Sequence, residues 1–275
     1  MPATRRNRRL WWFVTTLVAL GGLTLGLSPS ATAAHPLGDA SAAGISGSTV
    51  VTGHPLRGKL IVLDAGHQLG AGAHPRQINR QVPAGGFKKA CQTSGTATNA
   101  GFPEATFAFD TVRQLKLRLE RLGATVQLTR KHNWMRLWGP CVDFRGRFGN
   151  REHADLKISI HGDGCYCAGH GFDVIAPTDR PPWTHDIYRS SLRLAGHIRG
   201  GLESAGFPVA NYVGGGDGID LRGDLATLNL SNIPTVMVEL GNMRQAHDAR
   251  VMSSVAGRHR YAVGLARGIV AFLHH

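Results

Sequence analysis

Residues Lys59 to Gly70 read KLIVLDAGHQLG. The apolar run Leu60–Leu63 has the length and composition of a buried strand, and the chain then passes through Gly66 to His67. We expect the glycine to let the backbone turn sharply, so that the histidine stands just beyond the strand end. A single histidine in that position is usually a surface residue. Its meaning therefore depends on whether other ligand-type residues end their own elements at the same place.

Two further strands end on such residues. The apolar segment Leu156–Ile160 is followed directly by His161, and the segment Pro234–Leu240 carries Glu239 near its end. In open α/β sheets, ligands bind beyond the carboxyl ends of the strands. We therefore expect His67 and His161 to meet there if their strands are parallel neighbours, with Glu239 close by.

A fourth candidate comes from a helix that begins near Glu104 and ends near Leu122, before Gly123. Its apolar residues recur at helical spacing, at positions 108, 112, 115, 119 and 122. Glu104 lies four residues before the first of them, on the same stripe. An acid at a helix start commonly faces water, but a carboxylate that points to the core needs a partner or a metal. The stripe favours a ligand role for Glu104.

The other segments alternate between strand and helix patterns. We predict further strands at 125–128 and 172–175, and helices at 185–204 and 257–273. Strands separated by helices predict a single α/β domain with a mostly parallel central sheet flanked by helices. The glycine-rich segment between His67 and Pro103 has no periodic pattern, and loops of this length in compact domains are usually functional or pinned.

The N-terminal residues have the pattern of an export signal. Four arginines precede an apolar run at 10–27, and small residues follow at 31–34. We predict a signal peptide at 1–34, a flexible leader at 35–58 and the catalytic domain at 59–275; an uncleaved membrane anchor is the alternative. Loss of the four arginines lowers the formal charge from +13 to +9. Such a charge favours an acidic wall polymer or a small anionic substrate, and the lack of nucleic-acid-binding motifs argues against nucleic acid.

The chain has four cysteines, at positions 91, 141, 165 and 167. In an exported chain an even number suggests disulfides, and four cysteines allow three pairings. Cys165 and Cys167 are too close for a relaxed bridge without local distortion. A strained bridge, free surface thiols and a second metal site with His170 all remain open for them.

Two histidines and one carboxylate form the ligand set of catalytic zinc, which keeps a fourth position for water. A carboxylate that does not bind the metal then takes the proton of that water. His67, Glu104 and His161 suit the ligand roles for one Zn²⁺, and Glu239 suits the role of base. The order of these residues matches no H-E-x-x-H helix, and no G-x-S-x-G motif occurs.

Four motifs together carry a family resemblance: LDAGH, the Pro-Glu helix start at 103–104, ADLKISIHGD and VMVELGNM. They resemble the zinc-dependent N-acetylmuramoyl-L-alanine amidases of the type-3 family over 59–273. The resemblance implies that His67, Glu104 and His161 take the zinc-ligand positions and Glu239 the catalytic position. It implies hydrolysis, by zinc-activated water, of the amide between the lactyl group of N-acetylmuramic acid and L-alanine, in peptidoglycan or in soluble muropeptides. By the same resemblance, Arg145 and Asn150 fall on the polar positions upstream of the strand that ends at His161.

The sequences CQTSGT and GPCVD resemble a compact secreted branch of that family, and this implies a disulfide between Cys91 and Cys141. After Glu239 the family often has Gly-Phe, whereas this chain has Gly241 and Asn242. We expect a secreted, periplasmic or wall-located monomer without stable membrane insertion once the signal is removed. The alternatives are a non-catalytic wall-binding or regulatory protein and a zinc peptidase or deacetylase that acts on other wall amides.

Overall fold

The structure is a computed structural model of the 275-residue chain, and it describes residues 53–274. The predicted signal at 1–34 and most of the predicted leader at 35–58 lie outside the described residues. Leu56, near the end of that leader, is fully buried, and its N–H donates to the carbonyl oxygen of Leu122 at 2.9 Å. The packed domain therefore begins before Lys59, because Leu56 belongs to its main core.

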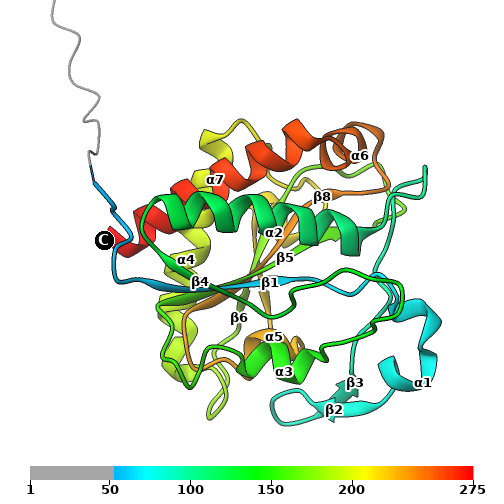
Figure 1. Cartoon of the computed structure of the whole chain (residues 1–275), viewed down its shortest axis with the longest axis horizontal. Helices are drawn as coiled ribbons and strands as arrows, with labels where there is room; N and C mark the ends of the chain where they lie inside the picture. The colour runs from blue at the N-terminus through cyan, green and yellow to red at the C-terminus, as the bar shows by residue number, and fades with distance from the viewer. Residues whose placement is uncertain (1–52, 275) are drawn as a thin grey trace, which may run out of the picture. The chain divides into compact units, whose positions relative to one another are not determined.

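A six-stranded sheet forms the centre of the domain (Figure 1). In spatial order its strands are β4 (Thr125–Leu128), β1 (Leu60–Ala65), β5 (Leu156–Asp163), β8 (Thr235–Asn242), β6 (Asp173–Pro177) and β7 (Ile219–Arg222). Neighbouring strands are parallel except for the antiparallel pair β8–β6. The predicted mostly parallel sheet is confirmed. Because β1, β5 and β8 are adjacent and parallel, their carboxyl ends meet at one edge.

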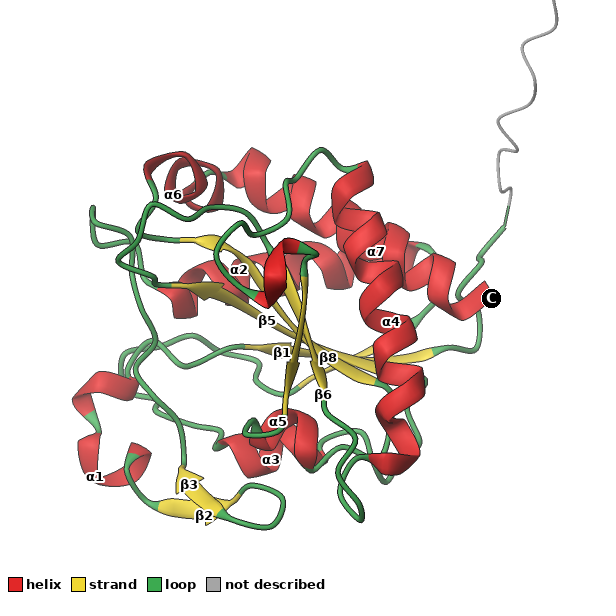
Figure 2. Ribbon diagram, turned by 180° about the vertical axis from the view of Figure 1, so that it is seen from behind, coloured by secondary structure: helices red, strands yellow, loops and turns green. Residues whose placement is uncertain are grey.

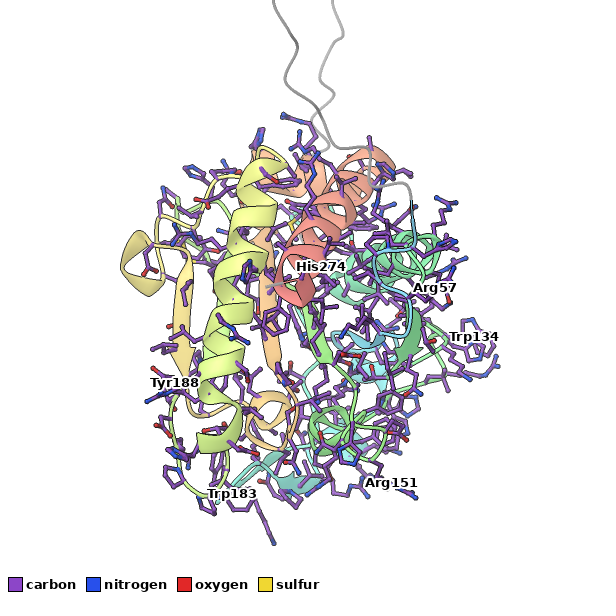
Figure 3. All side chains as sticks on the ribbon, turned by 90° about the vertical axis from the view of Figure 1, so that its left-hand side faces the viewer. Arg57, Trp134, Arg151, Trp183, Tyr188 and His274 are labelled. Carbon is purple, nitrogen blue, oxygen red and sulfur yellow. A yellow bond between two sulfur atoms is a disulfide. The ribbon has the colours of Figure 1, made fainter. Side chains whose placement is uncertain are left out.

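The two faces of the sheet are covered differently (Figure 2). One face bears the long helices α2 (Glu104–Arg121), α4 (His185–Ser204) and α7 (Val255–His274), with the shorter α6 (Ala246–Ser253) before α7. Figure 3 shows α4 and α7 side by side. The main apolar core lies between these helices and the sheet. The other face is covered by the short helices α3 (Val142–Arg147) and α5 (Ala226–Asn229) and by loops.

Strand alternation directs the polar side chains to this second face. Every second residue of β5 from Leu156 to Ile160 belongs to the main core. Ser159 and His161 therefore point to the opposite face, because successive strand residues alternate between faces. Glu239 is the register partner of His161 in the β5–β8 pair, so it points the same way.

The segment between His67 and α2 is folded onto the second face by local elements. It contains a 3₁₀ turn (Ala71–Ala73), α1 (Pro75–Ile78) and a hairpin of β2 (Gln81–Pro83) and β3 (Lys88–Ala90). Cys91 forms a disulfide with Cys141, directly before α3, with a Cα–Cα distance of 4.4 Å. The bridge implied by the family resemblance is therefore present, and it pins this segment.

The elements with strong periodicity agree with the prediction, and helix α4 has the predicted bounds 185–204. The sequence pattern missed the short elements: α1, α3, α5, α6, β7, the β2–β3 hairpin and the 3₁₀ turn at Ala71–Ala73. Each has eight residues or fewer, so little periodicity can build up. Among residues 53–274, no helix combines the length and the apolar character needed to cross a bilayer.

Candidate metal centre

The predicted ligand residues converge from three separate elements. His67 lies two residues beyond β1, Glu104 is the first residue of α2, and His161 lies in β5. One ligand atom from each lies within 4.8 Å of the others. Glu239, in β8, lines the same cavity as both histidines. The fold therefore brings together all four residues that the sequence pattern selected.

The Glu104 carboxylate stands between the two imidazole rings. Its Oε1 lies 3.1 Å from His67 Nε2 and 3.0 Å from His161 Nδ1. The rings meet edge to face, with centroids 4.9 Å apart. His67 Nδ1 donates to the carbonyl oxygen of Thr93 at 3.0 Å, because that oxygen can only accept. This bond engages Nδ1 and orients the ring so that Nε2 faces the centre.

The backbone at the end of β1 differs from the predicted turn. The left-handed conformation belongs to His67, with φ 53°, and not to Gly66, which does not have a positive φ. A Cβ added to Gly66 would lie 2.4 Å from Cε1 and 2.5 Å from Nδ1 of His161. The glycine is therefore needed to leave room for the ring of His161, and the expectation that it provides the sharp turn is wrong.

Arg145 holds the backbone that carries His67. Its guanidinium group donates to the carbonyl oxygens of Ala65, at 2.6 Å, and of His67, at 2.8 Å, and it forms an ion pair with Asp64 at 2.5 Å. Burial by itself would raise the pKa of Asp64, but Arg145 and hydroxyl donors such as Ser159 lower it to about 2. The buried pair of Asp64 and Arg145 is thus charged and fixed, and it supports His67, whose backbone has a positive φ.

A second arginine, Arg130, also holds this segment. It donates to the carbonyl oxygens of Ala65 at 2.9 Å, Gly66 at 3.1 Å and Ala105 at 2.8 Å. It therefore ties the loop before His67 to the first turn of α2, which starts at Glu104. The sequence pattern did not select Arg130. Its only signal is its position two residues after the strand β4, and that alone does not reveal a link to β1.

Glu104 is held in its charged form. Burial would raise its pKa, but the neighbouring His67 and the hydrogen bonds of both histidine rings hold the pKa well below its usual value. Its Oε2 also accepts from the backbone N–H of Thr96 at 2.9 Å, and its Oε1 from that of Gly162 at 3.3 Å. A buried carboxylate with this pattern of donors is suited to a metal ligand.

Glu239 is in the opposite electrostatic state. Its Oε2 is buried and has no hydrogen-bond partner among residues 53–274. Burial first, and then the charges of Glu104, Asp173 and Asp163, raise its pKa well above the usual value. The negative charges of these three carboxyl groups therefore oppose ionisation of Glu239, and Arg222 offsets them only in part.

A divalent cation fits this arrangement. The donor set of two imidazoles and one carboxylate is that of a catalytic zinc site. A cation at this point would also balance the mutual repulsion of the Glu104 and Glu239 carboxyl groups, and Glu239 lines the cavity that the two histidines share. The adjoining cavity, of about 250 Å³, leads from the two histidines to β3 and α5. It gives room for a substrate beside the ligands.

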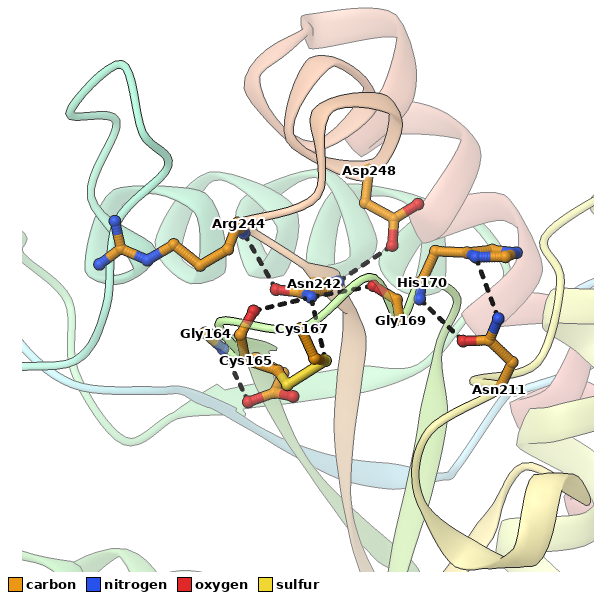
Figure 4. The surroundings of a disulfide bond; sticks show 10 residues. Gly164, Cys165, Cys167, Gly169, His170, Asn211, Asn242, Arg244 and Asp248 are labelled. Carbon is orange, nitrogen blue, oxygen red and sulfur yellow. Dashed lines mark hydrogen bonds between the residues drawn. A yellow bond between two sulfur atoms is a disulfide. The ribbon is translucent and has the colours of Figure 1, made fainter.

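A second disulfide, Cys165–Cys167, lies in the loop after β5 (Figure 4). The Asn242 side-chain amide donates to the carbonyl oxygens of Cys165 at 3.0 Å and Gly169 at 2.9 Å. Asn242 lies three residues beyond Glu239, where the sequence departs from the usual family pattern. In this chain the asparagine ties the end of β8 to the disulfide loop, which explains a polar residue there.

Known proteins are similar to this chain in sequence and in fold. The family model described as N-acetylmuramoyl-L-alanine amidase matches residues 61–271. The chain is 40% identical over 235 residues to the N-acetylmuramoyl-L-alanine amidase Rv3717 of Mycobacterium tuberculosis, a match that covers 85% of this chain and 94% of the relative. Similar solved structures are the N-acetylmuramyl-L-alanine amidases Ami1 of Mycobacterium abscessus and of Mycobacterium smegmatis. The first is 43% identical with a TM-score of 0.73, covering 79% of this chain and 100% of that one. The second is 39% identical with a TM-score of 0.74, covering 80% and 98%.

The family model thus spans the sheet and the helices around it, including all four residues of the centre. The relatives are similar over nearly their whole length, and their structures have the same fold. The chain belongs to the N-acetylmuramoyl-L-alanine amidase family.

Proposed function

We propose that this amidase is a zinc enzyme that hydrolyses the amide bond between the lactyl group of N-acetylmuramic acid and L-alanine, in peptidoglycan or its soluble fragments. Family membership supports the bond that is cleaved. One observation carries the metal assignment: the ligand atoms of His67, Glu104 and His161 converge within 4.8 Å, next to the cavity that Glu239 lines.

The ligand atoms for zinc are Nε2 of His67, Nδ1 of His161 and Oε1 of Glu104. When bound, zinc supplies a Lewis acid that activates water and polarises the scissile carbonyl. The protein contributes the orientation of the ligands. The Thr93 carbonyl orients the ring of His67, and the backbone N–H groups of Thr96 and Gly162 hold the carboxylate of Glu104 in place.

Glu239 moves the proton. Its carboxylate takes a proton from the attacking water and then delivers it to the nitrogen of the leaving L-alanine. Burial first, and then the charge of Glu104, raise the pKa of Glu239. A carboxyl group with a raised pKa holds a proton more readily than an exposed one, and a proton donor requires this property. The free oxygen of Glu239 has no competing protein partner in the described region.

The place of action follows from the same proposal. The predicted signal peptide at 1–34 and the strongly basic charge suit a monomeric enzyme that is exported and acts on an acidic wall polymer. Oxidising conditions outside the cytoplasm also suit a chain with two disulfides.

The test is metal removal and replacement on residues 35–275. The protein is stripped with a chelator, its metal content is measured, and release of the peptide from N-acetylmuramoyl dipeptide is followed by chromatography. We expect no release from the stripped protein and restored release with one equivalent of zinc. Glu239→Gln loaded with zinc is the control for chemistry without a base. Full activity in protein shown to be free of metal would contradict the proposal.

A further inference from the structure

Gln92 has an unusual position in the cavity beside the metal centre. The residue is only 4% exposed, and neither the Nε2 nor the Oε1 of its amide has a hydrogen-bond partner among residues 53–274. It lines the same cavity as His67, His161 and Glu239. A primary amide offers two donors and two acceptor lone pairs, so its full hydrogen-bonding capacity is left unused.

The backbone on both sides of Gln92 is anchored. Cys91 is joined to Cys141, and its N–H and carbonyl groups bond to Arg80 and Val142 at 2.8 and 2.7 Å. The N–H of Gln92 itself donates to Ile78 at 3.2 Å. On the other side, the carbonyl oxygen of Thr93 accepts from the zinc-ligand candidate His67. The amide is therefore held at a defined place next to the metal centre.

A buried amide without partners destabilises the ligand-free fold, because its groups lose water and gain nothing in return. An apolar side chain at this position would remove that cost. The polar side chain is explained if a ligand supplies the missing hydrogen bonds when it enters the cavity. Because the cavity adjoins the metal centre, that ligand is part of the substrate.

The chemistry of the cavity selects the peptide side of the substrate over the sugar side. Half-buried Lys89 lines the cavity, and its ammonium group bonds to one protein carbonyl, that of Asp224 at 2.8 Å. Apolar contacts come from residues 90, 142, 225 and 237. An amide, a cation and apolar walls suit a short peptide that carries a carboxylate. A neutral sugar has no carboxylate for Lys89 to bind.

We propose that the side-chain amide of Gln92 binds the first peptide bond beyond the scissile amide, and so positions the stem peptide as the leaving group. This inference rests on the proposed function. A primary amide pairs with a secondary amide by donating to its carbonyl oxygen and accepting from its N–H. The first peptide bond of the stem begins at the carbonyl of the L-alanine whose nitrogen leaves, so it lies close to the scissile amide. Gln92 correspondingly precedes Thr93, whose carbonyl oxygen orients His67. Gln92 is thus a positioning and specificity residue.

The experiment compares the wild type with Gln92→Leu on two substrates. N-acetylmuramoyl dipeptide contains both the scissile amide and the first peptide bond beyond it. N-acetylmuramoyl ethylamide contains the scissile amide but lacks that peptide bond. We expect Gln92→Leu to lower kcat/KM on the dipeptide substrate by about tenfold to a hundredfold, the effect of leaving a buried polar group of the substrate unpaired. On the ethylamide the variant and the wild type should be equal. An equal loss on both substrates, or no loss on either, would overturn the inference.

Two further measurements separate this inference from the proposed function. Calorimetric binding of the product dipeptide should weaken about tenfold or more in Gln92→Leu, and this readout does not require turnover. The melting temperature of substrate-free Gln92→Leu should be equal to or above that of the wild type, because no protein hydrogen bond is lost. A clear drop would show a structural role and overturn the inference. Gln81 is an exposed glutamine of the neighbouring hairpin, and Gln81→Leu is the matched control. It should change neither the binding of the product dipeptide nor the melting temperature.

Discussion

Gly66→Ala tests the geometry of the metal centre without removing any ligand. The added Cβ would lie 2.4 to 2.7 Å from three ring atoms of His161, whereas ordinary contacts begin at 3.4 Å. The ring, or the backbone that carries Gly66, must therefore move by about 1 Å. Arg130 and Arg145 bind the carbonyl oxygens around Gly66, so that backbone is held firmly. We expect the ring of His161 to take up most of the shift.

The size of the effect follows from the tolerance of metal coordination. Ligand distances at a functional site vary by only about 0.2 Å, so a displacement of about 1 Å removes His161 from the ligand set or distorts the site strongly. We expect zinc affinity to fall by at least about a hundredfold. The crowding itself should lower the free energy of unfolding by about 1–3 kcal/mol, the usual range for an overpacked position.

Zinc affinity is measured by competition with a chromophoric chelator, and folding by the melting temperature of the metal-free protein. Gly72→Ala is the matched control in the same loop, because its added Cβ would lie 3.7 Å from its nearest neighbour, Ser94. This control should bind zinc like the wild type. Unchanged zinc affinity in a folded Gly66→Ala variant would refute the reasoning that the glycine is needed for space beside His161.

Three further outcomes follow from single residues. Glu239→Gln should keep its zinc, as measured by metal analysis, while the rate falls by about 10²–10⁴-fold because the base is lost; loss of zinc would instead make Glu239 a ligand. Cys91→Ala should lower the free energy of unfolding by about 2–4 kcal/mol and weaken zinc retention, because the bridge closes a separation of 50 residues beside the site; Cys165→Ala, whose bridge spans a separation of two, should cost less. Burial opposes ionisation of Asp64, but Arg145 holds its pKa at about 2, below the 3.8 of an unperturbed carboxyl group. The ionised Asp64 thus contributes roughly 2 kcal/mol to the free energy of unfolding above about pH 4, and this contribution is lost as the pH falls towards 2. Asp64→Asn should therefore flatten the decline of the melting temperature in that range. An unchanged decline would contradict this role.

The strand ends and the helix stripe could be predicted from the sequence because they depend on local periodicity. The apolar runs before His67 and His161 indicate strands whatever surrounds them, and Glu104 occupies a helical repeat that must face the core. Parallel adjacency of the strands then brings these residues together, and the register places Glu239 opposite His161.

The supporting interactions could not be predicted in the same way. Arg130 acts through carbonyl oxygens some 65 positions earlier in the chain, and no spacing rule links such groups. Buried Lys157 lies within an apolar strand, yet its ammonium group donates to carbonyl oxygens of α3, the nearest at 2.5 Å from that of Gly146. The positive φ of His67 likewise depends on its tertiary setting. Each of these features exists only after distant segments have met.

The central claim concerns which bond is broken, and an isotope label tests it most directly. Zinc-loaded protein is incubated with N-acetylmuramoyl dipeptide in water enriched in oxygen-18, and the products are analysed by mass spectrometry. The account predicts one labelled oxygen in the lactyl carboxylate of N-acetylmuramic acid and none in the released dipeptide. Label in alanine would show cleavage of the peptide bond, and label in free acetate would show deacetylation. Either result would contradict the amidase assignment.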